Sequence, residues 1–356
     1  MEFVADYGAF LLKTATIVAA VLLIIAGIAN ASARQKARSE GDLSIRKLND
    51  ELEDYRNSME DALLDKHELK ALVKSREKTA KEEDKAAKKK ASADASTSGK
   101  EAARKRVFVV DFDGDIRASD VEFLRHEISA ILTKATTDDE VVIRLESGGG
   151  MVHSYGLAAS QLHRIRDKNI PLTVCVDKVA ASGGYMMACL GNHVVAAPFA
   201  LIGSIGVMAQ VPNFSKILKK NDVDYELFTA GEFKRTVTMF GHNTPKAREK
   251  FQSDLEETHE LFKGHIARYR GELDVDKVAN GDVWYGQQAI DLGLIDAVST
   301  SDEYLANACE HADVFTVRYE LRKTLQEKLG LSAQVAAENA FHRVLTSIQN
   351  KLVSKS

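Results

Sequence analysis

The longest apolar segment lies near the amino end, where residues 14–33 (TATIVAAVLLIIAGIANASA) carry no charge. A helix of this length rises about 30 Å at about 1.5 Å per residue, enough to cross a bilayer core. The pattern predicts a transmembrane anchor within residues 1–33. A cleaved signal peptide is the alternative, since Ala31, Ser32 and Ala33 resemble a cleavage site. Glu2 and Asp6 occupy the place of the basic residues that begin such signals, so a retained anchor is preferred.

Residues 34–80 show apolar positions spaced alternately by three and four, which predicts a helical or coiled-coil stalk. These positions are Ile45, Leu48, Leu52, Tyr55, Met59, Ala62, Leu69 and Val73. An amphipathic helix lying on its own domain or on lipid fits the pattern equally well. Residues 81–106 are charged, rich in Ala and Ser and poor in bulky apolar residues. They predict a flexible linker, because such a segment buries too little surface to offset its ordering entropy.

Residues 107–312 change to short apolar runs separated by amphipathic segments. The runs at 107–112, 140–146, 172–177 and 193–198 predict buried strands. Helices are expected over 118–135 and through Leu157, Leu162 and Ile165. Because the strands are continuous runs rich in β-branched residues rather than alternating patterns, they indicate an α/β domain whose mainly parallel sheet is covered on both faces.

Residues 313–356 are expected to form a C-terminal helical extension. One helix face would carry apolar side chains at positions Val335, Phe341, Val344, Leu345, Ile348 and Leu352. The extension could pack against a neighbouring subunit or cap its own core, and the pattern does not separate these alternatives.

Composition narrows the class of protein. The 356 residues are 45% hydrophobic and 28% charged, which excludes a wholly disordered chain and a polytopic membrane protein. Three cysteines are too few for a disulfide framework or a zinc cluster. The net charge of −4 gives no basic excess for nucleic acid. Basic residues cluster after residue 33, which by the positive-inside rule favours a cytoplasmic main domain.

A glycine-rich turn follows the second strand, where Gly148, Gly149 and Gly150 precede a helix. Backbone N–H groups at such a junction can hold a phosphate or an oxyanion. No Gly-Lys-Ser or Gly-Lys-Thr follows, so a nucleotide P-loop is unsupported. A plain tight turn is the alternative.

The third strand leads into a lone hydroxyl, Ser182, flanked by Ala180, Ala181, Gly183 and Gly184. Small neighbours at a strand-to-helix junction suit a nucleophilic serine, which needs an exposed Oγ and a nearby N–H for the oxyanion. A helix-capping serine in a glycine turn fits the same local sequence.

Such a serine needs a general base. None of the ten histidines lies in a recognisable Ser/His/Asp order or at a characteristic spacing from a carboxylate. A lysine base must be neutral, which requires its pKa to fall from about 10.4 toward 7 by desolvation. Lys234 is the better candidate, because Phe228, Phe233 and Phe240 lie near it in the sequence. Lys178 is the rival, and the residues alone leave the choice open.

Five segments together resemble the SppA/SohB family of membrane-bound serine peptidases. They are LESGGGMVHS, AASGGYMMA, IGSIGVMAQ, AGEFKRTVTMFG and WYGQQAIDLGLID, in that order along the chain. The resemblance implies a crotonase/ClpP-like fold of repeated ββα units, preceded by the anchor and stalk. It also implies a Ser–Lys dyad with Ser182 as nucleophile and Lys234 as general base. Ser204 would orient the lysine, and the N–H groups of Gly148, Gly149 and Gly183 would form the oxyanion hole.

The resemblance further implies a homo-oligomeric ring in which neighbouring subunits share the dyad, with no metal or cofactor. It places the protein in the inner membrane of a bacterium and allows a periplasmic catalytic domain, against the charge pattern. The expected activity is hydrolysis of peptide bonds in signal-peptide fragments or misfolded membrane-associated polypeptides. An acyl-CoA enzyme of the crotonase fold and a non-catalytic membrane scaffold are the alternatives.

Overall fold

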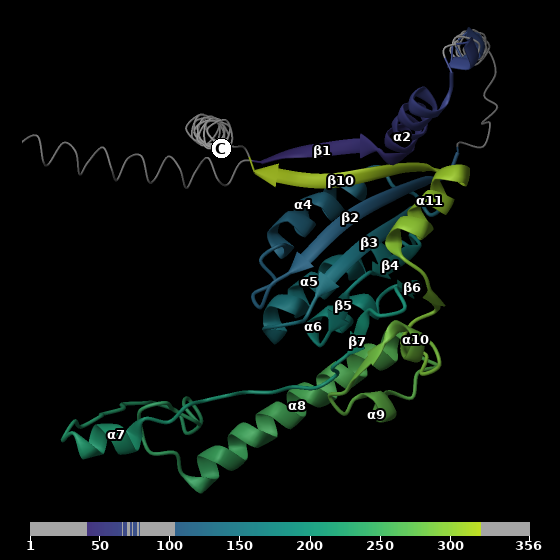
Figure 1. Ribbon diagram of the computed structural model, residues 1–356. Helices are drawn as coiled ribbons and strands as arrows, with labels where there is room; N and C mark the ends of the chain where they lie inside the picture. Colours follow the sequence, from purple (N-terminus) through teal and green to yellow (C-terminus); the bar gives the residue numbers. More distant parts are fainter. Residues whose placement is uncertain are drawn as a thin grey trace, which may run out of the picture. The chain divides into compact units, whose positions relative to one another are not determined.

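The protein is represented by a computed structural model that describes residues 41–321, apart from 66, 70, 71, 73, 77 and 79–103 (Figure 1). The described residues fall into two units, residues 41–44 with 319–321, and Ile45–Arg318. The candidate site lies entirely within the second unit.

The described strands form one branched sheet. They are β1 (Gly41–Lys47), β2 (Arg106–Gly114), β3 (Glu140–Ser147), β4 (Leu172–Val176), β5 (Val179–Ala181), β6 (His193–Ala196), β7 (Leu201–Gly203), β8 (Val283–Tyr285), β9 (Ala297–Val298) and β10 (Asp313–Leu321). The main path runs β1-β10-β2-β3-β4-β6-β9. A branch leaves it at β3, which also pairs with β5; β5 pairs with β7, and β7 with β8. From β10 to β9 and through β5 to β7 the pairing is parallel, whereas β7 and β8 are antiparallel.

The four strands predicted between residues 107 and 198 are confirmed as β2, β3, β4 and β6. Their parallel pairing is also confirmed. Every residue of β4 is buried, which is why its sequence LTVCV shows no polar alternation.

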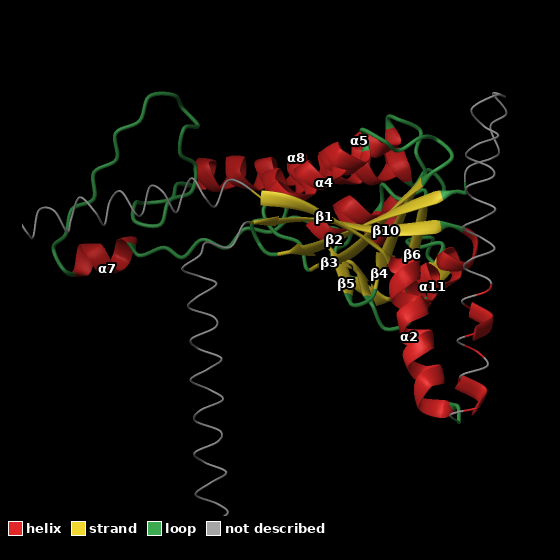
Figure 2. Ribbon diagram, turned by 90° about the horizontal axis from the view of Figure 1, so that it is seen from above, coloured by secondary structure: helices red, strands yellow, loops and turns green. Residues whose placement is uncertain are grey.

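Helices cover both faces of this sheet. They are α2 (Leu48–Leu63), α4 (Val121–Ile131), α5 (Val152–Arg166), α6 (Gly183–Ala188), α7 (Ser215–Lys220), α8 (Pro245–Tyr269), α9 (Val275–Val278), α10 (Gly286–Ala289) and α11 (Ser301–His311). Figure 2 shows α4, α5 and α8 on one side of the strands and α11 on the other. The helix predicted over 118–135 is confirmed as α4, which is shorter than predicted at both ends.

The two faces of the sheet supply two separate cores, because successive side chains of a strand point in opposite directions. On β3, Val141 and Ile143 pack with Leu124 and Ile128 of α4 in the larger core. Val142 faces the smaller core beneath α11. The smaller core comprises Val107, Val109, Val142, Cys175, Val195, Leu305, Ala312 and Val314.

The predicted continuous helical stalk over residues 34–80 is wrong at its beginning and near its middle. Ile45 lies in strand β1, and α2 starts only at Leu48. The helix ends at Leu63, since Leu64 is extended. In the first turn of α2, Asn49 Nδ2 donates to the Cys309 carbonyl at 3.0 Å, and Asn49 Oδ1 accepts from the Val314 N–H. The start of this segment is thus fastened to the α/β domain.

The boundary expected at residue 313 is also wrong. Residues 313–321 form β10, which pairs in parallel with β2 in the register Val314 to Val107 and Thr316 to Val109. Val314 and Val317 are buried, so this strand belongs to the sheet rather than to a helical extension.

Three further predictions fall on residues outside the described part. They are the membrane span over 14–33, nearly all of the linker over 81–106, and the helix carrying Val335 to Leu352. Among the described residues, no helix has the length and apolarity needed to cross a bilayer.

An ion pair at the amino ends of β2 and β3 yields a stability test. Burial alone would raise the pKa of Asp139, but hydrogen bonds from Arg106 and Thr136 lower it to about 2. Arg106 donates from Nε at 2.9 Å and from Nη2 at 2.6 Å. A carboxyl whose pKa falls on folding contributes stability above its unfolded value of about 3.9, and loses it as pH falls through the folded value.

Asp139→Asn should therefore lower the free energy of unfolding by about 2 kcal/mol at pH 7. About half of this difference should remain at pH 3, and little at pH 2. Urea unfolding of both proteins at pH 7, 5 and 3 measures it. If the loss of stability in Asp139→Asn were the same at every pH, the ionised Asp139 carboxylate would not be its cause. Asp138→Asn is the control, and because Asp138 is exposed, this change should leave the free energy of unfolding unaltered.

Candidate active site

Ser182 lies at a strand-to-helix junction, as the sequence predicted, but the strand before it is the short, unpredicted β5 rather than the strand predicted over 172–177. The Ser182 backbone is in a region that residues with a side chain rarely adopt, with φ 53° and ψ −118°. Its N–H donates to the Gly203 carbonyl at 2.8 Å, and its carbonyl accepts from the Met186 N–H at 2.9 Å. The residue is thus held by hydrogen bonds on both sides of the turn.

A backbone of this kind costs about 1–3 kcal/mol and persists only where the surrounding structure imposes it. Here β5 is held between β3, through Ala180 and Ser147, and β7, through all three of its residues. Strain of this kind is concentrated at functional sites, so Ser182 is a candidate reactive residue rather than an ordinary helix cap. Its side chain also makes no capping hydrogen bond to α6.

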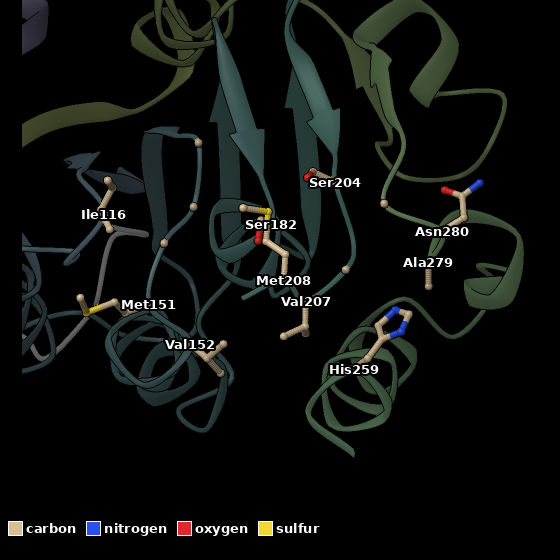
Figure 3. Close-up of a pocket in the computed structure, with 15 residues that line it drawn as sticks. Ile116, Met151, Val152, Ser182, Ser204, Val207, Met208, His259, Ala279 and Asn280 are labelled. Atoms are coloured by element: carbon tan, nitrogen blue, oxygen red, sulfur yellow. The ribbon is translucent and has the colours of Figure 1, made fainter. Parts of the chain in front are cut away.

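Ser204 lies beside Ser182 because of strand register. Ala181 of β5 is paired with Gly203 of β7, so the next residues of the two parallel strands emerge at the same edge. Ser204 also has a positive φ of 49°, and its N–H donates to the Asp282 carbonyl. Figure 3 shows both serine side chains at the ends of these neighbouring strands.

The glycine-rich turn approaches Ser182 closely. Gly149 has φ +85°, and a Cβ there would come within 2.7 Å of the Gly183 nitrogen and of the Ser182 Cβ. Only glycine therefore fits. The Gly149 N–H donates to Ser147 Oγ at 3.0 Å, so this predicted oxyanion donor is already engaged. Gly148 is exposed at the turn, and Gly183 begins α6, where its N–H has no acceptor within the helix.

A cavity of about 830 Å³ opens over these residues. Figure 3 shows its lining, which combines main chain with largely apolar side chains. The lining residues are Ile116, Gly148, Gly149, Gly150, Met151, Val152, Ser182, Ser204, Gly206, Val207, Met208, His259, Ala279, Asn280 and Gly281. Of the residues singled out in the sequence, Ser182, Ser204, Gly148, Gly149 and Gly150 line this cavity, whereas Gly183 does not.

His259, from α8, also lines the cavity, and sequence analysis missed it. It is the only ionisable side chain among the lining residues. Its Nε2 is buried without a hydrogen-bond partner. Nothing in the sequence near His259 marks it, because its neighbours resemble any charged helix; only the packing of α8 against the cavity reveals it.

Lys234 is not among the residues that line this cavity. It is exposed in the segment between α7 and α8, which Figure 1 shows extending away from the sheet. The predicted apolar surroundings are present but open to solvent, since Phe228 is 88% exposed and Phe233 48%. Within one chain, therefore, Ser182 and Lys234 are not brought together. Further apolar side chains are exposed within this segment, namely Val223, Tyr225, Leu227, Met239 and Phe240. Before the segment, Met208, Val211, Phe214 and, in α7, Ile217 are also exposed.

The rival base, Lys178, is unsuited to that role. Its Nζ lies 2.9 Å from a carboxylate oxygen of Glu146, and its side chain is 71% exposed. The hydrogen bond to Glu146 raises the pKa of Lys178, which favours its protonated form. It is also absent from the cavity lining.

Other reactive groups are buried or dispersed. Burial raises the pKa of the Cys175 thiol to about 12 and that of Cys189 still further, so neither is a ready nucleophile. Within the described part of the chain, no group of three or more His, Cys, Asp or Glu side chains could hold a metal ion.

Comparison with known proteins gives matches along nearly the whole chain. Family models for the N-terminal part of peptidase family S49 and for peptidase family S49 match residues 2–162 and 164–315. A probable protease SohB of Haemophilus influenzae is 47% identical over 346 residues, 97% of each chain. A putative protease SohB of Buchnera aphidicola is 38% identical over 98% of this chain and 99% of its own. Protease 4 of Haemophilus influenzae is 27% identical over 51% of this chain and 30% of its own.

The strained backbone of Ser182 predicts an unusual order of stabilities. Glycine adopts positive φ readily, whereas alanine keeps the strained Cβ. Ser182→Gly should therefore be more stable than Ser182→Ala by about 1 kcal/mol, measured by urea unfolding.

Ser160, on the exposed face of α5, is the matched control. There the order should reverse, with Ser160→Gly less stable than Ser160→Ala by about 1 kcal/mol. The same order at both positions would mean that Ser182 is not strained.

Proposed function

The chain belongs to peptidase family S49, and from this premise we propose that it is a serine-type endopeptidase with Ser182 as nucleophile and Lys234 as general base. The observation that carries the proposal is the strained Ser182 on the lining of an apolar cavity, between the exposed Gly148 of the glycine-rich turn and the Gly183 N–H at the start of α6. An oxyanion-binding main chain and an exposed hydroxyl are the parts that acyl transfer requires.

In the proposed reaction the neutral Lys234 amine takes the proton from Ser182 Oγ as this oxygen attacks the peptide carbonyl carbon. The negative charge that develops on the carbonyl oxygen is stabilised by the N–H groups of Gly148 and Gly183. The C–N bond then breaks, and the lysine gives its proton to the leaving amine. Water, deprotonated by the same lysine, hydrolyses the acyl-enzyme and restores Ser182. The Ser204 hydroxyl, beside Ser182, would orient the lysine.

The lysine is proposed to come from a second copy of the chain. A lysine base must lose its proton and hence its solvation, and Lys234 is exposed in the single chain. The segment around it also exposes Phe228, Phe233 and Phe240. Packing of this segment against a neighbour would cover these side chains and remove Lys234 from water. A ring of such heterologous contacts would give each subunit one complete site.

The cavity favours a polypeptide substrate with apolar side chains. Its walls are formed by Ile116, Met151, Val152, Val207 and Met208. Signal-peptide fragments and misfolded membrane-associated polypeptides have this character. An anchor within residues 1–33 would hold the enzyme at the bacterial inner membrane, close to such substrates.

The two alternatives have less support. A crotonase-type acyl-CoA enzyme would need a catalytic carboxylate, and no Asp or Glu is among the residues that line the cavity. A non-catalytic scaffold would not need the strained backbone at Ser182.

Replacing either member of the dyad should abolish peptidase activity. Ser182→Ala and Lys234→Ala should each lower kcat by at least about 1,000-fold on a fluorogenic apolar peptide, and the double variant should be little worse than either. Ser182→Ala should also lose labelling by a fluorophosphonate. Lys178→Ala is the matched control, because Lys178 is an exposed lysine near Ser182 in the sequence, and it should keep normal activity.

Full activity in Ser182→Ala would exclude the serine mechanism. Substantial activity in Lys234→Ala, lost instead in His259→Ala, would move the base to the histidine within the same chain.

A further inference from the structure

The hydroxyl groups of Ser147 and Tyr155 form a buried pair directly behind the glycine-rich turn. Ser147 is 2% exposed and Tyr155 is fully buried. Ser147 ends β3 and Tyr155 lies in the first turn of α5, so the pair closes the connection between strand and helix. Their oxygens are 2.5 Å apart.

Main-chain groups from two neighbouring segments converge on this pair. The Tyr155 hydroxyl donates to the Asp115 carbonyl at 2.7 Å, and the Gly114 carbonyl lies 3.1 Å from Ser147 Oγ. Ser147 Oγ also accepts the Gly149 N–H at 3.0 Å. The pair thus ties the end of β2 to the turn that approaches Ser182, and it determines which way the Gly149 N–H points.

The main chain packs tightly around the pair at three glycines. A Cβ on Gly114 would come within 2.5 Å of the Tyr155 hydroxyl, and one on Gly183 within 2.4 Å of the Tyr155 ring. A Cβ on Gly184 would come within 2.5 Å of the Ser147 carbonyl oxygen. The first residues of α6 therefore rest directly on Ser147 and Tyr155, and these two side chains contact both sides of the oxyanion-binding region.

We propose that Ser147 and Tyr155 are positioning residues that hold the glycine-rich turn and the start of α6 at the separation that the oxyanion requires. The inference rests on the proposed function. Donors stabilise an oxyanion effectively only at about 2.7–3.1 Å from its oxygen, and preorganised donors avoid reorganisation during the reaction. Neither residue is among those that line the cavity, so the pair acts on the transition state by placing the donors Gly148 and Gly183, through the Gly149 hydrogen bond and the Tyr155 ring, rather than on the bound substrate.

Deleting one hydroxyl should therefore reduce kcat and leave KM nearly unchanged. Tyr155→Phe keeps the buried ring, and Ser147→Ala removes the acceptor of the Gly149 N–H. Each should lower kcat by about 10-fold or more, with KM within about twofold of the wild-type value. The kcat of the double variant should be close to that of the less active single variant, because the two hydroxyls act as a unit.

Affinity for a peptide boronate provides a readout that a purely structural role would not move. Its tetrahedral adduct with Ser182 mimics the intermediate, so its inhibition constant should rise by the same factor by which kcat/KM falls. Tyr304→Phe is the matched control. Its hydroxyl donates to the Glu140 carboxylate at the opposite end of β3, so it loses a comparable hydrogen bond away from the cavity. It should keep wild-type kcat and boronate affinity.

If folded Tyr155→Phe and Ser147→Ala kept the wild-type kcat and boronate affinity, the positioning role would be overturned, whereas the proposed function would stand. An equal loss of kcat in Tyr304→Phe would also overturn the positioning role, because the effect would then follow general stability. A wild-type protein that neither cleaves the peptide nor reacts with the boronate at Ser182 would overturn the proposed function together with this inference.

Discussion

The insertion of β5 between β3 and β7 is the constraint on which the whole site depends. This strand is only three residues long, and Ser182, directly after it, has a strained backbone with φ 53°. The same pairing brings Ser204 to the same edge. Its contact with β3 sets the glycine-rich turn against the start of α6. The two cores, one on each face of the sheet, provide the stability that allows this local strain to persist.

The site is built chiefly from main chain rather than from charged side chains. Gly149 admits the close approach of two backbone segments, and the buried hydroxyls of Ser147 and Tyr155 fill the space behind them. The cavity in one chain supplies a nucleophile and an apolar wall, with His259 as its only ionisable side chain. Under the proposed mechanism the lysine base would come from the exposed segment of another copy, and activity would then depend on assembly.

Much of the α/β domain could be predicted from sequence, because buried parallel strands such as 140–146 contain consecutive β-branched residues, here Val141, Val142 and Ile143. Ser182 could also be found locally, since its small neighbours mark a tight strand-to-helix turn. Other features depend on distant contacts. Strand β10 is not predicted, because residues 313–321 become a strand only by pairing with β2. The sequence places Ile45 in a helix because Ile45 fits the three-and-four spacing of the apolar residues that follow it, whereas the structure places it in β1. The direction of the Gly149 N–H and the position of His259 result from packing, which no local pattern records.

The most direct measurement is the activity of mixed complexes formed by co-expressing Ser182→Ala and Lys234→Ala chains. If each site takes its serine from one subunit and its lysine from the next, about a quarter of the junctions in a random closed ring will contain both residues. Purified complexes shown to contain both variants should then hydrolyse a fluorogenic peptide at about a quarter of the wild-type rate. Mixed complexes with no more activity than either parent would contradict the account, because each chain would then have to build its own dyad.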